Sequence, residues 1–263
     1  MADFTSHIPG TFSWPELVTT DQKAGVAFYQ ALFGWNANDI PMGPDGTYSM
    51  FQMRGKEVAA AAGLRPEERQ QGIPSHWNSY ITVKNVDETV KKAQTLGANV
   101  FAPPFDVMDA GRMAVLQDPT GAVFQVWQAN KSIGAKILNE PGALCWTELT
   151  TTDTKAAEKF YTQLFGWTPK HSAPSATMDY TEFSVGGTPS IGMMAKPADM
   201  PAHIPSYWMP YFMVADVDAS TAKAKSLGGR AMVEPMDIPN TGRFSIVADP
   251  EGAMFAVFAP AAR

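Results

Sequence analysis

The chain is poor in cysteine and histidine: its 263 residues include one cysteine and four histidines. A single cysteine, Cys145, excludes a disulfide within the chain and is typical of a reducing compartment, so we expect a cytoplasmic protein. Cys145 falls within a predicted strand, where a small buried side chain is the simplest interpretation. Disulfide-stabilised secreted folds are therefore excluded.

Basic clusters and long apolar runs are also missing. The formal net charge is −6, and no stripe of Lys and Arg could neutralise phosphates, which argues against a nucleic-acid partner. No apolar run approaches the ~18 residues of a membrane span, and no basic amphipathic segment suits a membrane surface. The opening MADFTSHIPG lacks the basic and apolar regions of a secretory signal. We therefore expect neither a nucleic acid nor a membrane as partner.

What the chain does contain is an internal repeat. The segment 14–35, WPELVTTDQKAGVAFYQALFGW, returns at 146–167 as WTELTTTDTKAAEKFYTQLFGW, 132 residues later. A second segment, 73–129, matches 204–260 without a gap at an offset of 131 residues. Repetition of half a chain predicts two similar domains, which we place at residues 1–130 and 131–263.

Each copy of the first segment reads as a strand followed by a helix. Trp14, Glu16 and Val18 lie on one side of an alternating, strand-like pattern. Asp21 stands where a helix N-cap belongs, and Gly34 can supply the left-handed residue that ends the helix. The second copy keeps each signal.

The rest of each half continues as strands around a second helix. In the first half we expect strands at 35–40, 47–53, 57–64, 78–83, 99–101, 112–116 and 123–128, a charged surface loop at 65–74, a helix at 86–96, and a packed connector at 130–141. This gives four β-α-β-β-β units in two domains. Because so few helices can cover only one face of each sheet, the fold class is α+β, and the uncovered faces should frame a cleft.

Four motifs occur twice: the strand leading to T-x-D, the helix end FYxxLFGW, the helix V-D-x-x-x-x-K-A-x-x-LG, and the turn DPxG. With them the sequence resembles the vicinal oxygen chelate superfamily, which includes glyoxalase I, extradiol dioxygenases, and the fosfomycin and bleomycin resistance proteins. The resemblance covers nearly the whole chain and is closest to tandem two-domain, actinobacterial-type members. It implies four βαβββ units paired into two glyoxalase-like domains.

Metal enzymes of that superfamily hold a divalent ion on the first, fourth, fifth and last strands of a domain. Carried over to this chain, the resemblance points to Trp14, the stretch 59–63, Asn78 and Gln125 in the first half, and to Trp146, the stretch 191–195, Met209 and Ala256 in the second. None is a histidine or a carboxylate, the groups that such a cation needs. We therefore expect no metal and no other cofactor.

By strand parity, the inward faces carry aromatic rings with few polar groups. The candidate ligand-binding residues are Trp14, Tyr48, Asn78, Tyr80, Gln125 and Trp127 in the first half, and Trp146, Tyr180, Met209 and Tyr211 in the second. This composition is typical of a small-molecule pocket. Aromatic residues that simply fill a closed core would show the same pattern.

Glu16 and Glu148 face the same way, two residues after the tryptophans. Burying a carboxylate without a partner is costly, so three interpretations are open. Each could pair with an arginine, such as Arg112 or Arg243. Each could bind a polar group of a ligand, or act as a general base with a raised pKa.

Three functions remain open. The first is a metal-independent protein that binds a hydrophobic or aromatic metabolite or antibiotic in a cleft of each domain. The second is a lyase, isomerase or glyoxalase-type enzyme with Glu16 and Glu148 as its acid/base residues. The third is a protein-interaction module with a degenerate second domain. Because the chain already contains paired units, we expect a monomer or a homodimer.

Overall fold

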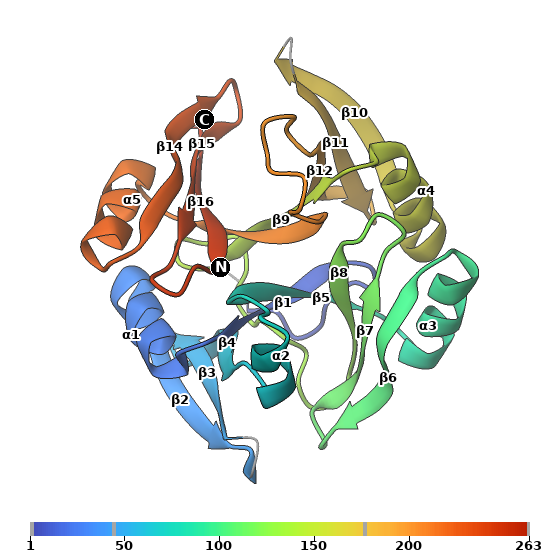
Figure 1. The fold of residues 1–263 in the computed structure, drawn as a ribbon, viewed down its shortest axis with the longest axis horizontal. Coiled ribbons are helices and arrows are strands. Elements are labelled where there is room, and N and C mark those ends of the chain that lie inside the picture. The colour runs from blue at the N-terminus through green and yellow to red at the C-terminus, as the bar shows by residue number, and fades with distance from the viewer. Residues whose placement is uncertain (1–2, 44–45, 176–177, 262–263) are drawn as a thin grey trace.

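The chain folds into two eight-stranded sheets of mixed strand direction, one from each half (Figure 1). The computed structural model describes residues 3–43, 46–175 and 178–261. The first sheet has the order β2-β3-β4-β1-β5-β8-β7-β6, and the second has the order β10-β11-β12-β9-β13-β16-β15-β14. The two orders are equivalent, so the sequence repeat is a repeat of topology.

The strands of the first sheet are β1 (Phe12–Thr19), β2 (Asn36–Pro41), β3 (Thr47–Met53), β4 (Lys56–Gly63), β5 (His76–Thr82), β6 (Asn99–Val107), β7 (Gly111–Gln117) and β8 (Val123–Ala129). Those of the second are β9 (Leu144–Thr151), β10 (Thr168–Ser175), β11 (Met178–Val185), β12 (Thr188–Ala195), β13 (Tyr207–Met213), β14 (Arg230–Ile238), β15 (Gly242–Ala248) and β16 (Met254–Pro260). The helices are α1 (Gln22–Phe33), α2 (Pro66–Gln70), α3 (Val86–Thr95), α4 (Thr154–Phe165) and α5 (Val217–Ser226). No helix in the described ranges is long and apolar enough to cross a membrane.

The two units of each half join edge to edge through their first strands. β1 pairs antiparallel with β5, which sets Glu16 opposite Asn78 and Trp14 opposite Tyr80. Within a unit, β1 pairs parallel with β4, because α1 and the β2–β3 hairpin intervene in the chain. Residues from the two units therefore meet on the central strands.

The predicted helix signals work as expected. The Asp21 carboxylate accepts a hydrogen bond from the Ala24 amide at 3.0 Å, and Gly34 ends α1 with φ of 73°. The prediction of a loop at 65–74 was partly wrong, because this segment contains the short helix α2. Pro66 begins that helix, and the Glu68 carboxylate accepts from the Arg65 amide at 2.8 Å, which favours a helical turn.

The large hydrophobic cores lie between the two sheets, where the helices are. One core combines the α3 unit of the first half with the α4 unit of the second, and the other combines the α1 and α5 units. Figure 1 shows α1 beside α5 and α3 beside α4. A smaller hydrophobic cluster lies on the opposite face of each sheet, and it contains strand and loop residues only. We call these the first and second inner faces.

Candidate functional site

Glu16 is the centre of the first inner face. It is 9% exposed, and its Oε2 accepts hydrogen bonds from the Tyr80 hydroxyl at 2.8 Å and from Asn78 Nδ2 at 3.1 Å. The Asn78 carbonyl in turn accepts from Gln125 Nε2 at 2.8 Å. β1, β5 and β8 thus carry a continuous polar chain from Glu16 to Gln125 across three neighbouring strands.

Aromatic residues surround this chain. Trp14, Tyr80 and Trp127 are buried together, with Tyr48 packed against them. The Trp14 indole donates to the Tyr48 hydroxyl at 3.1 Å. Burial, together with the nearby Glu16 charge, raises the pKa of Tyr80 and of Tyr48 well above the usual value. Both phenols are therefore hydrogen-bond donors at any physiological pH.

The second inner face holds Glu148 in a different way. Its Oε2 accepts from the Tyr180 hydroxyl and its Oε1 from the Tyr211 hydroxyl, both at 2.7 Å. The Trp146 indole donates to Tyr180 at 3.0 Å. Burial raises the pKa of Glu148, and the two tyrosine hydrogen bonds oppose that rise. Both carboxylate oxygens are therefore satisfied within the protein.

A glycine makes room for this arrangement. Gly192 lies opposite Glu148 in the β12–β9 pairing, and a Cβ there would collide with the Tyr180 hydroxyl and lie 2.6 Å from the Trp146 indole nitrogen. The equivalent residue beside Glu16 is Ala60. The absence of one methyl group thus allows Tyr180 to reach its carboxylate.

The polar chain of the first face has no counterpart in the second. Met209, 2% exposed, and Ala256, fully buried, occupy the places of Asn78 and Gln125. The second inner face is therefore more apolar, with Glu148 and its tyrosines as its polar centre.

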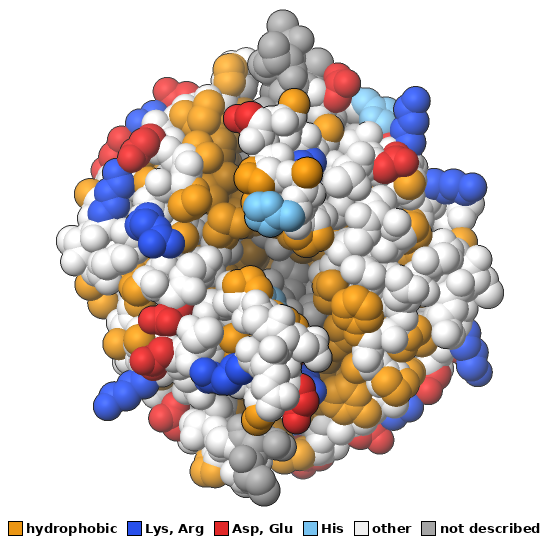
Figure 2. Space-filling view, in the orientation of Figure 1, with side chains coloured by type: hydrophobic (Ala, Val, Ile, Leu, Met, Phe, Trp, Pro, Cys, Tyr) orange, Lys and Arg blue, Asp and Glu red, His pale blue; other side chains and the backbone are white. Residues whose placement is uncertain are grey.

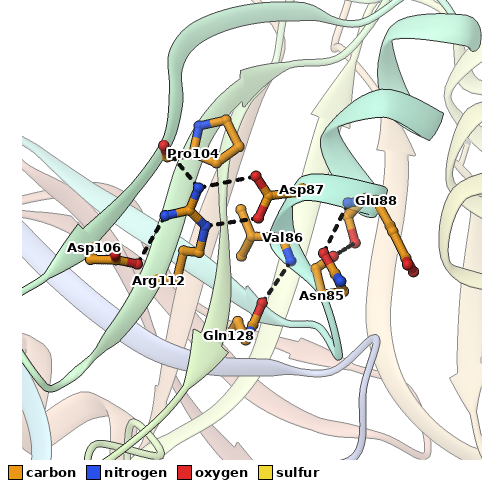
Figure 3. A network of polar contacts seen from close by, with 9 residues as sticks. Asn85, Val86, Asp87, Glu88, Pro104, Asp106, Arg112 and Gln128 are labelled. Carbon is orange, nitrogen blue, oxygen red and sulfur yellow. Dashed lines mark hydrogen bonds and ion pairs between the residues drawn. The ribbon is translucent and has the colours of Figure 1, made fainter.

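The interpretation that an arginine neutralises each glutamate is wrong. Arg112 binds Asp87 through Nε at 2.8 Å and Asp106 through Nη1 at 2.9 Å (Figure 3). Asp87 is the second residue of α3, so the guanidinium lies on the helix side of the sheet. Arg243 makes the same contacts with Asp218 and Asp237. Among the described residues, the donors to the two glutamates are three phenols and one amide, all of them neutral.

The donor set fits a divalent cation poorly. Across the described ranges no group of three or more His, Cys, Asp and Glu side chains is arranged to hold a metal. On the first face the strand register places Glu16, rather than Trp14, beside Asn78. The Asn78 oxygen already accepts from Gln125, which leaves one carboxylate and one amide oxygen for an ion. The second face offers only Glu148 beside a thioether and a methyl group.

A hollow of about 250 Å³ borders the second inner face at Trp146. It lies between the N-terminal segment, including Phe4 and His7, and the beginning of β9, including Cys145. Burial raises the pKa of the Cys145 thiol to about 12, which disfavours the thiolate, although the side chain is only partly buried. On the first face, the connector residue Ala135 packs against the cluster around Trp14.

Exposed apolar side chains extend both inner faces outward. Phe105 on β6 and Met236 on β14 are 40% and 48% exposed and pair with Met113 and Phe244, which belong to the inner-face clusters. Figure 2 shows hydrophobic side chains gathered over the β14–β16 arm and again over the β6–β8 arm. Met113 and Phe244 were not among the predicted ligand-binding residues, although alternation along 111–117 and 242–248 was the signal that could have found them.

The comparisons with known proteins place the chain in a class. The model of the Glyoxalase/Bleomycin resistance protein/Dioxygenase superfamily matches residues 11–126 and again 130–257. The chain therefore belongs to this superfamily, which confirms the resemblance drawn from its motifs and the α+β fold of two tandem glyoxalase-like domains.

Among individual proteins, it is 44% identical to "Putative glyoxylase CFP32" of Mycobacterium tuberculosis over 96% of this chain and 95% of that one. It is 34% identical to the anthracycline biosynthesis protein DauV of Streptomyces sp. (strain C5), over 96% and 94%. A solved Mn(II)-bound glyoxalase from Novosphingobium aromaticivorans shares the fold, with a TM-score of 0.66 and 16% identity over 95% of this chain and 82% of that one.

Proposed function

We propose that the protein binds a hydrophobic, aromatic small molecule on its inner faces without a metal ion. One observation carries the proposal: amide, thioether and methyl groups stand beside Glu16 and Glu148, at the positions that the resemblance to metal enzymes of this superfamily assigned to cation ligands. Such a lining suits flat apolar rings better than a hydrated cation. A relative named for anthracycline biosynthesis supports an aromatic ligand.

The test combines metal analysis with a binding titration. Purified protein is assayed for bound metals, then titrated with an anthracycline while tryptophan fluorescence is followed, because Trp14, Trp127 and Trp146 line the inner faces. We expect far less than one ion per chain and the same affinity after treatment with a chelator. A stoichiometric metal, or binding that disappears on chelation and returns with Mn(II), would contradict the proposal.

A second candidate is an enzyme, a lyase, isomerase or glyoxalase-type catalyst, with Glu148 or Glu16 as its acid/base residue. The raised pKa of Glu148 favours it, because burial makes this carboxyl hold its proton more tightly than an exposed one, as a general acid requires. Incubation with the same anthracycline followed by mass analysis separates the candidates. A passive binder returns the compound unchanged, whereas an enzyme yields a product that the Glu148→Gln variant does not form.

We propose further that the protein works in the cytoplasm as a monomer or homodimer, with a small molecule as its partner. Native mass spectrometry of the purified chain tests the stoichiometry and retains a bound compound. A firm protein partner with no small ligand would instead support an interaction module.

A further inference from the structure

We propose that the first inner face selects ligands that carry a hydroxyl or amine donor, and that Gln125 recognises this donor. The proposal rests on the proposed function, since it concerns the ligand of the same site. It adds a chemical requirement that aromatic lining alone does not impose, and it makes the two halves of the chain different in specificity.

The orientation of Gln125 follows from Glu16. A carboxylate can only accept, so Asn78 must present its NH₂ group to Glu16, as the 3.1 Å contact shows. The Asn78 oxygen then faces Gln125, which must turn its own NH₂ group toward it, at 2.8 Å. Glu16 thus fixes the orientation of the Asn78 amide, and Asn78 fixes that of the Gln125 amide.

The hydrogen-bonded series from Glu16 through Asn78 ends at Gln125, in an acceptor without a donor. Gln125 is 3% exposed, and its Oε1 has no hydrogen-bond partner among the residues that the structure describes. Buried carbonyl oxygens in proteins are nearly always paired, because an unpaired one has given up its bond to water. A ligand O–H or N–H would restore that bond.

The neighbours of Gln125 suit an aromatic ring that carries such a donor. Gln125 pairs with Tyr80 across β5 and β8, and Trp127 lies on the same face two residues further along. Tyr80 cannot supply the missing donor, because its hydroxyl already donates to Glu16. The Gln125 acceptor therefore lacks a donor among its described neighbours, and a ligand must enter the buried cluster beside Tyr80 and Trp127 to supply one.

The second inner face has no equivalent acceptor. Ala256 stands in the place of Gln125 and Met209 in that of Asn78, while both oxygens of Glu148 are occupied by tyrosines. At these positions the second inner face has no free acceptor for a ligand hydroxyl. It also provides a matched variant, since Asn78→Met with Gln125→Ala gives the first face a pair that the same fold already accommodates.

The experiment compares two probes that differ in one donor, 2-naphthol and 2-methoxynaphthalene, on the full-length protein by isothermal titration. We expect the first inner face of the wild type to bind 2-naphthol about tenfold more tightly than 2-methoxynaphthalene, the contribution of one hydrogen bond. In N78M/Q125A this preference should disappear while 2-methoxynaphthalene still binds. The contribution of the second half is the same in both proteins.

Gln94→Ala, an exposed change on α3, should behave as wild type and controls for substitution itself. Equal binding of both probes by wild type, or a preference that survives in N78M/Q125A, would overturn the inference and leave the proposed function standing. The first result would mean that a water molecule rather than the ligand satisfies Gln125. Failure of wild type to bind either probe would count against the proposed function as well.

Discussion

Glu16 and Glu148 occupy equivalent buried positions, yet their neighbours differ by a few atoms. Asn78 and Tyr80 share one oxygen of Glu16, whereas two tyrosines divide the oxygens of Glu148. Gly192 leaves room for the Tyr180 hydroxyl beside Glu148, whereas Ala60 stands beside Glu16. Single small substitutions have thus given the two halves distinct polar centres.

Glu148→Gln tests the raised pKa at this scale. Because the folded protein retains the proton above the ordinary carboxyl pKa of 4.5, it binds more protons than the unfolded chain between that value and the raised one. The free energy of unfolding therefore falls as pH rises through this window. Glutamine cannot lose a proton, so the melting temperature of E148Q minus that of wild type should increase as the pH rises above about 4.5.

Thermal melts of both proteins across that range measure this difference. Other carboxyls with raised pKa values, such as Asp249, titrate in both proteins and cancel. A difference that stays constant with pH would show that Glu148 has the same proton affinity in the folded and unfolded states.

At the scale of elements, the repeated motifs build the contact between the halves. The Tyr29 hydroxyl of α1 donates to Asp249 in the DPEG turn at 3.0 Å and accepts from the Trp77 indole at 3.0 Å. Tyr161 of α4 does the same with Asp118 and Trp208. FYxxLFGW and DPxG are thus two sides of one interface, formed twice.

Tyr29→Phe removes one of these connections. The Trp77 N–H loses its acceptor and Asp249 loses a donor in a buried site, so the free energy of unfolding should fall by about 1–3 kcal/mol. Denaturant titration measures the loss. Tyr161→Phe should lose a similar amount, and the double variant should lose the sum, since the two sites share no partner.

An unchanged denaturation midpoint in both single variants would show that these buried hydrogen bonds make no net contribution. Equal losses in the two single variants would support the equivalence of the two interfaces that their topology indicates.

At the scale of the whole molecule, neither half forms by itself the hydrophobic core that its helices cover. Each of the two large clusters combines side chains from both halves, with Tyr29 packed near Phe255 and Tyr161 near Phe124. A half separated from the other would expose the apolar surface of its helices. We therefore expect the two sheets to unfold together.

Calorimetry of the full chain should show a single unfolding transition, with a ratio of calorimetric to van't Hoff enthalpy of about one. The physical reason is that loss of one half exposes both shared cores. Two resolved transitions would indicate that the sheets unfold independently and that the contacts between them are weak.

The sequence by itself determined the repeat, the order of strands and helices apart from the short α2, the superfamily and the inward residues, because periodicity, capping residues and motifs are local properties. It could not determine which residues bond Glu16 and Glu148. An alternating pattern shows the face of a side chain but not its cross-strand neighbour. Only the register of β1 with β5 decided that Glu16 meets Asn78, and only the fold showed that Asp87 of α3 binds Arg112. The unpaired acceptor of Gln125 likewise depends on three strands at once, which the tertiary structure alone brings together.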